Sequence, residues 1–326
     1  MEMVRIGVVA PRSFRAEDEY KNAERAQAYV KEAADNGAQL ICFPEGYPGP
    51  CSGPMDSGGH LDKIPIEMMR ESAKRHRVYI SCGNLEESAE IKEAYYLCHK
   101  LISPQGAIIA NYKRCQPTPP ALNSYLYNGR SHLLPGNEPI VVDTELGKIG
   151  LIICSELWVP ELSRIEMLMG ARIILDPIGG THSRTRAQRY DESGSIRRGS
   201  KMAIWQCIAQ TRAVENMVYV VGTANVFFDE SPWGSFVAGP DGLIVASEGE
   251  GISSAVLDMQ RLESLRNRAW EETDLQPPPD DLTVYRPLSC QPGQNRDRRP
   301  ELYSKLVDHQ IDAFNFSYYT KDGEFS

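Results

Sequence analysis

The segment that most constrains the fold is residues 147–161, GKIGLIICSELWVPE, in which a short apolar run ends abruptly at Cys154. A run of about five apolar residues bounded by glycine is typical of a buried strand. Pro160 then stands at the first-turn position of a helical pattern that continues to Leu168. Cys154 is therefore predicted to lie where a core strand meets the start of a helix. Backbone amides at such a junction are free to stabilise developing negative charge.

Strand and helix patterns are mixed along the rest of the chain. Short apolar runs predict strands, and several of them lead directly into helical spacing. Other runs flank the turn sequences at 103–106 and 239–242, which predict hairpins. The combination of β-α alternation with hairpins indicates a mixed α/β protein. The expected strands are 4–10, 39–43, 78–84, 95–102, 107–112, 140–143, 148–153, 172–175, 218–224, 234–238, 243–247 and 253–257, and the expected helices are 16–36, 66–76, 201–215 and one after Pro160.

Composition excludes several classes of protein. A net charge of −9 without a long basic block argues against nucleic-acid binding. No segment approaches the roughly 20 apolar residues of a membrane span, and residues 1–10 are too short for a signal peptide. The eight cysteines show no CxxC spacing, which argues against a zinc site, and a disulfide scaffold is not expected without a signal peptide. We therefore expect a soluble, reduced, cytoplasmic protein.

The composition changes after Trp270, where acidic residues and the triplet 277–279 of prolines begin. We predict one domain over residues 1–270 and a C-terminal extension over 271–326. The extension has too few periodic apolar residues for a core of its own, so its aromatic side chains need another surface to cover. We expect this extension to make contacts in a homodimer or higher homo-oligomer. The aromatic residues concerned are Tyr303, Phe314, Phe316, Tyr318 and Tyr319.

Three predicted strands are followed within one or two residues by a chemically capable side chain: Glu45, Lys113 and Cys154. Strands that end together would gather these residues at one edge of a sheet. A thiol near its ordinary pKa is mostly protonated at neutral pH, so it needs a base or a cation to become a nucleophile. Glu45 is suited to accept the proton, and Lys113 to stabilise the negative charge of a tetrahedral intermediate.

The segments FPEGYP (43–48), NYKR (111–114) and GLIICSELWVPE (150–161) resemble the three signature segments of the nitrilase superfamily, the carbon–nitrogen hydrolases. This resemblance implies a single-domain, four-layer α-β-β-α sandwich and a catalytic triad of Glu45, Lys113 and Cys154, with the backbone amide of Ser155 in the oxyanion site. It implies no metal and no organic cofactor. Further segments match in the same order: GARIILDP (170–177), RAVENMVYVVGTAN (212–225), GSFVAGPDG (234–242) and RRPELY (298–303).

The resemblance implies attack of Cys154 on a small-molecule substrate to form a thioester, from which water releases an acid. Pro160–Glu161 after the cysteine is similar to amidases and carbamoyl hydrolases, which favours an amide or N-carbamoyl compound. A nitrilase that converts a nitrile to acid and ammonia is the closest alternative. An acyl-transferring or non-hydrolytic, binding member of the family is a further alternative.

That further alternative arises because one acidic residue is missing. Members of the family usually carry a second glutamate between the lysine and the cysteine, whereas residues 114–137 contain no Asp or Glu. Asn128 is close to the expected position and His132 lies near it. An asparagine can hydrogen-bond but cannot act as a base. Asn128 is equally well explained as a turn residue before Gly129.

Other residues are candidates for supporting roles. We expect Glu156 and Glu215 to act as structural hydrogen-bonding partners around the nucleophile, and Trp158 either to line the pocket or simply to pack. The polar segment 179–200 contains five arginines, which suit binding of an anionic substrate group, although a solvated loop explains them as well. His182 and Arg184 are the pocket candidates in this segment.

Overall fold

The computed structural model describes residues 2–51, 64–92, 94–117, 132–180, 201–229, 231–267 and 298–307, with only the backbone of His132, Lys201 and Asn267. The chain divides into two units, Met1–Arg266 and Asn267–Ser326.

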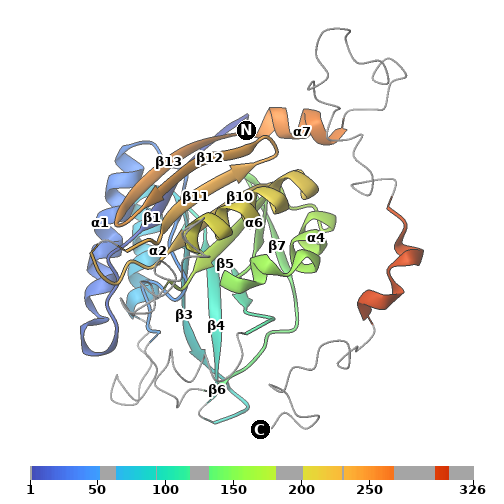
Figure 1. The fold of residues 1–326 in the computed structure, drawn as a ribbon. Coiled ribbons are helices and arrows are strands. Elements are labelled where there is room, and N and C mark those ends of the chain that lie inside the picture. The colour runs from blue at the N-terminus through green and yellow to red at the C-terminus, as the bar shows by residue number, and fades with distance from the viewer. Residues whose placement is uncertain are drawn as a thin grey trace, which may run out of the picture. The chain divides into compact units, whose positions relative to one another are not determined.

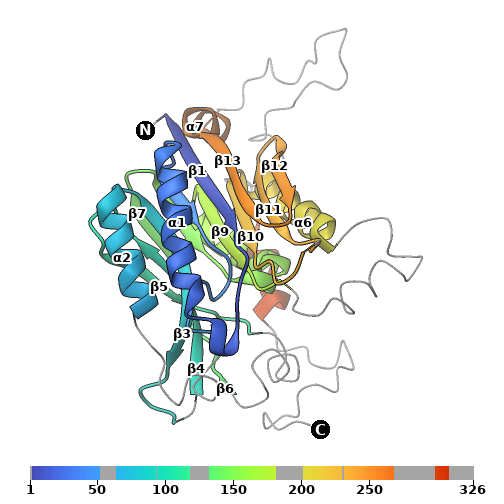
Figure 2. The ribbon, with the colours of Figure 1, turned by 90° about the vertical axis from the view of Figure 1, so that its left-hand side faces the viewer.

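The first unit is built on two β-sheets (Figures 1 and 2). Each sheet has a centre of three parallel strands, next to which the neighbouring strands run antiparallel. The first sheet has the order β13-β1-β2-β3-β4-β5, with β6 beside β4: β13 is Gly251–Asp258, β1 Met3–Ala10, β2 Leu40–Cys42, β3 Tyr79–Glu87, β4 Ala94–Ile102, β5 Ile108–Lys113 and β6 His132–Leu133. The second has the order β12-β11-β10-β9-β8-β7: β12 is Gly242–Glu248, β11 Gly234–Gly239, β10 Tyr219–Ala224, β9 Ile173–Ile178, β8 Gly147–Leu151 and β7 Ile140–Thr144.

Helices cover the outer face of each sheet. The helices α1 (Lys21–Asp35) and α2 (Ile64–His76) pack on the first sheet, and α4 (Pro160–Leu168) and α6 (Lys201–Asn216) pack on the second (Figures 1 and 2). The helix α7 (Met259–Asn267) follows β13, and the short 3₁₀ helices η1 (Ala16–Asp18) and η2 (Cys154–Trp158) precede α1 and α4. This arrangement confirms the predicted four-layer α-β-β-α sandwich.

The main core lies between the two sheets, and strand alternation explains how β8 contributes to it. Ile149, Leu151 and Ile153 are buried in the cluster between the sheets, whereas Ile152 is buried under the helices. Successive side chains of a strand point to opposite faces, so an uninterrupted apolar run is what a strand buried on both faces requires. This burial holds the end of β8, and therefore Cys154, in place.

Gly222 in β10 marks a close contact in the second sheet. It pairs with Phe236 of β11, and a methyl group added at Gly222 would lie 2.1 Å from the buried Phe236 ring. We expect G222A to destabilise the protein by about 1–3 kcal/mol, because the ring has no space to move into. Urea unfolding monitored by circular dichroism measures this loss. The double variant G222A/F236L is expected to recover part of the stability, and an unchanged midpoint for G222A would contradict the packing described.

The second unit is described over residues 298–307, which form two 3₁₀ turns, η5 (Pro300–Leu302) and η6 (Ser304–Val307). Leu302, Leu306 and Val307 are exposed there. Of the aromatic residues in the predicted oligomer contact, Tyr303 lies in this segment and the other four lie outside the described residues. The oligomer contact therefore stays a prediction. Among the helices that the structure describes, none combines the length and the apolar character needed to cross a bilayer.

Candidate active site

Cys154 begins η2 three residues after the end of the strand β8, at the junction that its position in the sequence predicted. Its backbone has φ +56°, in the left-handed region that residues with a Cβ atom rarely adopt. The side chain is partly exposed and packs against both the cluster between the sheets and the cluster under the helices. A cysteine held in this conformation by surrounding structure is a candidate for function.

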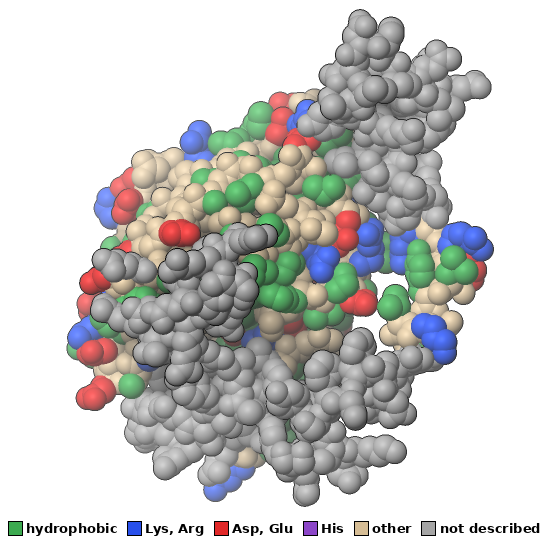
Figure 3. Space-filling view, viewed as in Figure 1, with side chains coloured by type: hydrophobic (Ala, Val, Ile, Leu, Met, Phe, Trp, Pro, Cys, Tyr) green, Lys and Arg blue, Asp and Glu red, His purple; other side chains and the backbone are tan. Residues whose placement is uncertain are grey.

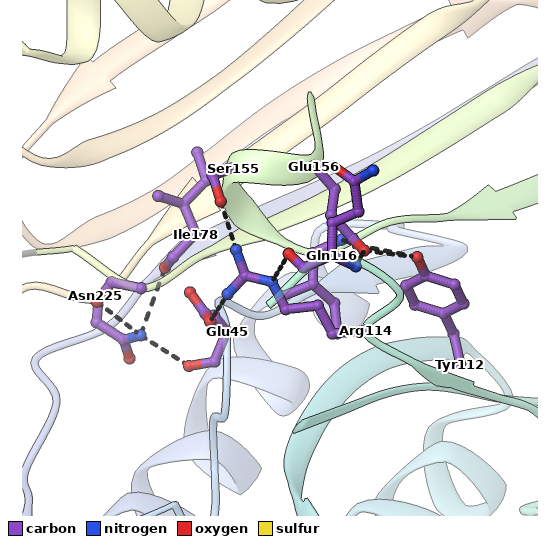
Figure 4. Close-up of polar contacts among 10 residues, drawn as sticks. Glu45, Tyr112, Arg114, Gln116, Ser155, Glu156, Ile178 and Asn225 are labelled. Atoms are coloured by element: carbon purple, nitrogen blue, oxygen red, sulfur yellow. Dashed lines mark hydrogen bonds and ion pairs between the residues drawn. The ribbon is translucent and has the colours of Figure 1, made fainter. Parts of the chain in front are cut away.

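Glu45 lies in the loop after β2 and is buried. The side-chain amide of Asn225, after β10, donates a hydrogen bond of 2.9 Å to the Glu45 backbone carbonyl (Figure 4). A Cβ atom added at Gly179 would lie 2.5 Å from Glu45 Oε2, so the carboxylate packs directly against the backbone after β9. Glu45 therefore stands where the carboxyl ends of parallel strands from both sheets meet.

Arg114 is the buried cation of this region and follows β5 directly. Its Nη1 lies 3.1 Å from Glu45 Oε1, and its Nη2 donates a hydrogen bond to Ser155 Oγ (Figure 4). Its Nε donates to the backbone carbonyl of Gln116 at 3.0 Å. One guanidinium thus connects Glu45 with the residue that follows Cys154. A planar group with several fixed donors is suited to such a bridge.

Lys113 does not reach this position. Its Nζ lies 3.9 Å from the centre of the Tyr96 ring, in a cation–π contact. Tyr112 is buried in the core between the sheets, and side chains alternate along a strand, so Lys113 points to the opposite face from Tyr112 and Arg114. The placement of Lys113 beside Glu45 and Cys154 is therefore corrected: Arg114 provides the cation there.

The surroundings of Cys154 favour the protonated thiol. Burial is the largest effect and raises the pKa of Cys154 well above its ordinary value, and the Glu45 carboxylate raises this pKa further. Arg114 opposes them and lowers the pKa. Because a thiolate is not favoured in advance, the thiol must lose its proton to a nearby base as it attacks, and Glu45 is suited to accept it.

Glu156 is fully buried and holds η2 against the end of β5. Its carboxylate accepts hydrogen bonds from the Tyr112 hydroxyl at 2.9 Å and from the backbone amides of Gln116 and Ile153 at 2.7 and 2.8 Å (Figure 4). Burial raises the pKa of Glu156, while Arg114 and these hydrogen bonds lower it. The contacts of Glu156 fix Arg114 and Cys154 relative to each other.

Glu215 acts further away, on the helix α6. It forms an ion pair of 2.9 Å with Arg212, whose Nε donates a hydrogen bond of 3.0 Å to the Leu157 carbonyl in η2. Among the residues that the structure describes, Glu215 supports η2 through Arg212.

Trp158 is 46% exposed, and its ring packs edge-to-face on Trp205 of α6 at 5.6 Å between ring centres. It packs on this helix at the protein surface, and hydrophobic side chains gather on this face in Figure 3. Four other pocket candidates lie wholly or partly outside the described residues: Asn128, His182, Arg184 and the side chain of His132.

Sequence reasoning missed two buried acids, Glu166 in α4 and Asp176 in β9. Each is 1% exposed, and in the described part of the chain no oxygen of either carboxyl makes a well-formed hydrogen bond. The available signal was their position within apolar segments, Ile165–Met167 and Leu175–Ile178, where a charged residue is unusual.

Glu166 gives a prediction for stability against pH. Burial raises its pKa well above the ordinary value, and Glu156 raises it further. The folded state therefore keeps a proton that the unfolded state releases, so stability falls as pH rises from the unfolded pKa toward the folded one. We expect E166Q to melt above the wild type at neutral pH and to match it near pH 4. Thermal melts across this range measure the difference, with the exposed Glu161→Gln as control. A difference that is independent of pH would contradict this assignment.

The two-sheet sandwich, with a cysteine, a glutamate and a cation where parallel strands end, defines the class of protein as a nitrilase-type hydrolase with an α-β-β-α sandwich. The family model for carbon-nitrogen hydrolases matches residues 5–267, and the chain belongs to this family. Among its relatives, the omega-amidase NIT2-A of Xenopus laevis is 28% identical over 258 residues, covering 76% of this chain and 86% of the relative. The human deaminated glutathione amidase is 28% identical over 308 residues, covering 89% and 81%.

Solved structures agree on the fold. Nit3 of Saccharomyces cerevisiae, a member of branch 10 of the nitrilase superfamily, has a TM-score of 0.64 at 20% identity and covers 81% of this chain and 93% of its own. An amidase from Nesterenkonia sp. has a TM-score of 0.60 at 18% identity, covering 83% and 94%.

Proposed function

We propose that this enzyme hydrolyses the C–N bond of a small amide, with Cys154 as nucleophile, Glu45 as proton acceptor and donor, and Arg114 as the cation of the site. The observation that carries the proposal is the Arg114 guanidinium, bound to both Glu45 and Ser155 beside a left-handed Cys154. This arrangement assembles the nucleophile, the base and the positive charge at one place.

The first half of the reaction forms a thioester. Cys154 Sγ attacks the amide carbon while its proton passes to Glu45. The carbonyl oxygen gains a negative charge, which the backbone amide of Ser155 and the guanidinium of Arg114 stabilise. The C–N bond then breaks, Glu45 returns the proton to the nitrogen, and ammonia or an amine leaves. The acyl group remains on sulfur.

The second half transfers the acyl group from Cys154 to water. Water attacks the thioester carbon, Glu45 takes the proton of the water, and the same donors stabilise the second tetrahedral intermediate. The C–S bond breaks, the carboxylic acid leaves, and the proton returns to the Cys154 sulfur. No acidic residue occurs between positions 114 and 137, so Glu45 serves both halves.

Arg114 takes the role that the sequence suggested for Lys113. An arginine stays charged at every relevant pH and has donors for more than one acceptor at once. Here two of its nitrogens are engaged by Glu45 and Ser155, which fixes the guanidinium in place before substrate binds. Such preorganised charge is effective in a site that excludes water.

An amide substrate is favoured over a nitrile for two reasons. Relatives that cover most of the chain are an omega-amidase and a deaminated glutathione amidase. The dipeptide Pro160–Glu161 also begins α4 directly after η2, which is the arrangement that the resemblance connects with amidases and carbamoyl hydrolases.

The test is incubation of the full chain with small primary amides, including amides of dicarboxylic acids, and with N-carbamoyl compounds and nitriles. Ammonia release and intact mass are followed together, with C154A as control. Ammonia from amides, with a transient acyl adduct on Cys154, is the expected result. Ammonia from nitriles alone would make the chain a nitrilase. A stable acyl adduct with about one equivalent of ammonia per enzyme and no further release would indicate acyl transfer. Neither ammonia nor an adduct with any substrate would overturn the proposal in favour of binding.

A further inference from the structure

Asp176 lies inside the strand β9, close to the candidate site but outside the mechanism above. It pairs with Gly222 of β10, which has no side chain, and shares a strand face with Ile174 and Ile178, both buried under the helices. Cys154 packs against the same apolar cluster. A carboxyl group has therefore been placed among apolar side chains immediately behind the candidate nucleophile.

The surroundings of Asp176 do not compensate a negative charge. It is 1% exposed, and neither carboxyl oxygen makes a well-formed hydrogen bond within the described chain. Burial raises the pKa of Asp176 well above its ordinary value, and Glu45 and Glu156 raise it further. The backbone amide of Cys154 and the Arg114 guanidinium act in the opposite sense. An unpaired buried carboxyl keeps its proton because the charged form is far costlier to bury.

We propose that Asp176 is a positioning residue for the turn at Cys154 and that it carries a proton in the working enzyme. The inference rests on the proposed role of Cys154 as nucleophile. Asp176 shares its face of β9 with Ile174 and Ile178, and the cluster of these two residues also packs against Cys154, so a neutral carboxyl at this place supports the left-handed turn from behind. An ionised carboxyl at the same place would instead oppose the developing thiolate, because Asp176 as an anion raises the pKa of Cys154.

Glu166 provides a matched control within the same protein. It is equally buried, and its oxygens also lack well-formed hydrogen bonds in the described residues. Its carboxyl, however, lies against Gly150 in the middle of β8, and the charged neighbour that affects it is Glu156. Replacement of Glu166 therefore tests the effect of removing a buried acid without touching the Cys154 turn.

The experiment measures the rate at which iodoacetamide alkylates Cys154, located by peptide mass spectrometry, in the wild type, D176N, D176A and E166Q. This readout needs no substrate, so it is independent of whether any amide is hydrolysed. We expect D176A to react at least about tenfold more slowly, because a displaced nucleophile loses its geometry. We expect the conservative D176N to restore the rate to within about threefold of wild type, since it is neutral like the protonated acid. E166Q is expected to react like the wild type.

Two results would overturn the proposal. A D176N alkylation rate more than about tenfold above wild type at neutral pH would mean that Asp176 is ionised in the wild type. The reason is that removing a negative charge beside the Cys154 thiol lowers the pKa of that thiol. A D176A rate equal to wild type would mean that Asp176 does not position Cys154. If D176A fails to fold by circular dichroism, infrared difference spectra of wild type minus D176N decide the question. The carbonyl band of a protonated carboxylic acid supports the proposal, and its absence at neutral pH overturns it.

Discussion

Replacement of Cys154 by alanine is expected to lower kcat/KM for the amide substrate by at least about 10⁴-fold and to abolish the covalent adduct. The reason is that alanine removes the atom that we propose forms the thioester, while Glu45 and Arg114 remain and keep the rest of the proposed site. Substrate affinity, measured by calorimetry, is therefore expected to change by less than about tenfold. The measurement combines ammonia release with intact mass after incubation.

Cys115 is the matched control for this variant. Its thiol is half-buried and hydrogen-bonds to the Lys113 carbonyl at 3.6 Å, and burial raises its pKa. C115A should keep kcat/KM within about threefold of wild type, since a cysteine packed in this way behaves as a small apolar side chain. An acyl adduct that persists in C154A and disappears in C115A would transfer the nucleophile to Cys115.

The second large effect is expected from Arg114. R114M should reduce kcat/KM by about 10³-fold, comparable to the loss of one donor that stabilises the oxyanion. It should also destabilise the fold by about 3 kcal/mol, because the buried Glu45 carboxylate loses its partner. R114K should recover part of the activity only, since one ammonium cannot reproduce the two separate contacts with Glu45 and Ser155.

A variant of the neighbouring Lys113 tests whether the predicted loss of activity is specific to Arg114. K113M keeps the length of the side chain and removes its charge, and it should leave kcat/KM within about threefold of wild type. Its cost should be the cation–π contact with Tyr96, about 0.5–1 kcal/mol of stability. Kinetics and thermal melts of R114M and K113M, measured in parallel, show which of the two cations the reaction requires. A larger loss of activity in K113M than in R114M would restore Lys113 to the site.

The architecture was predictable because it follows from local patterns. Apolar runs of strand length, helical spacing between them and turn sequences at the hairpins are properties of neighbouring residues, and they led to the mixed α/β class. The positions of Cys154 after β8 and of Glu45 after β2 were predictable for the same reason. Both residues follow an apolar run, and the first polar residues after the run mark the end of the strand.

The strand β9 shows where such signals fail. Asp176 and Pro177 are typical of loops, so the strand was expected to end at residue 175, yet β9 continues to Ile178. The burial of the Asp176 carboxyl depends on β10, which presents Gly222 beside it, and on the helices that cover this face. None of these neighbours is close in sequence.

The sequence by itself determined the sandwich and the family, and it suggested two of the three residues that we propose to carry the chemistry. Only the tertiary structure suggested the third, because Lys113 and Arg114 are both cations at the end of one strand and differ only in the face to which they point. A shift of one residue reverses that face. The face is set by the burial of Tyr112 against Glu156, a contact across 44 residues between the two sheets. The packing of the sheets therefore directs Arg114 to Glu45 and Ser155, and leaves Lys113 over Tyr96.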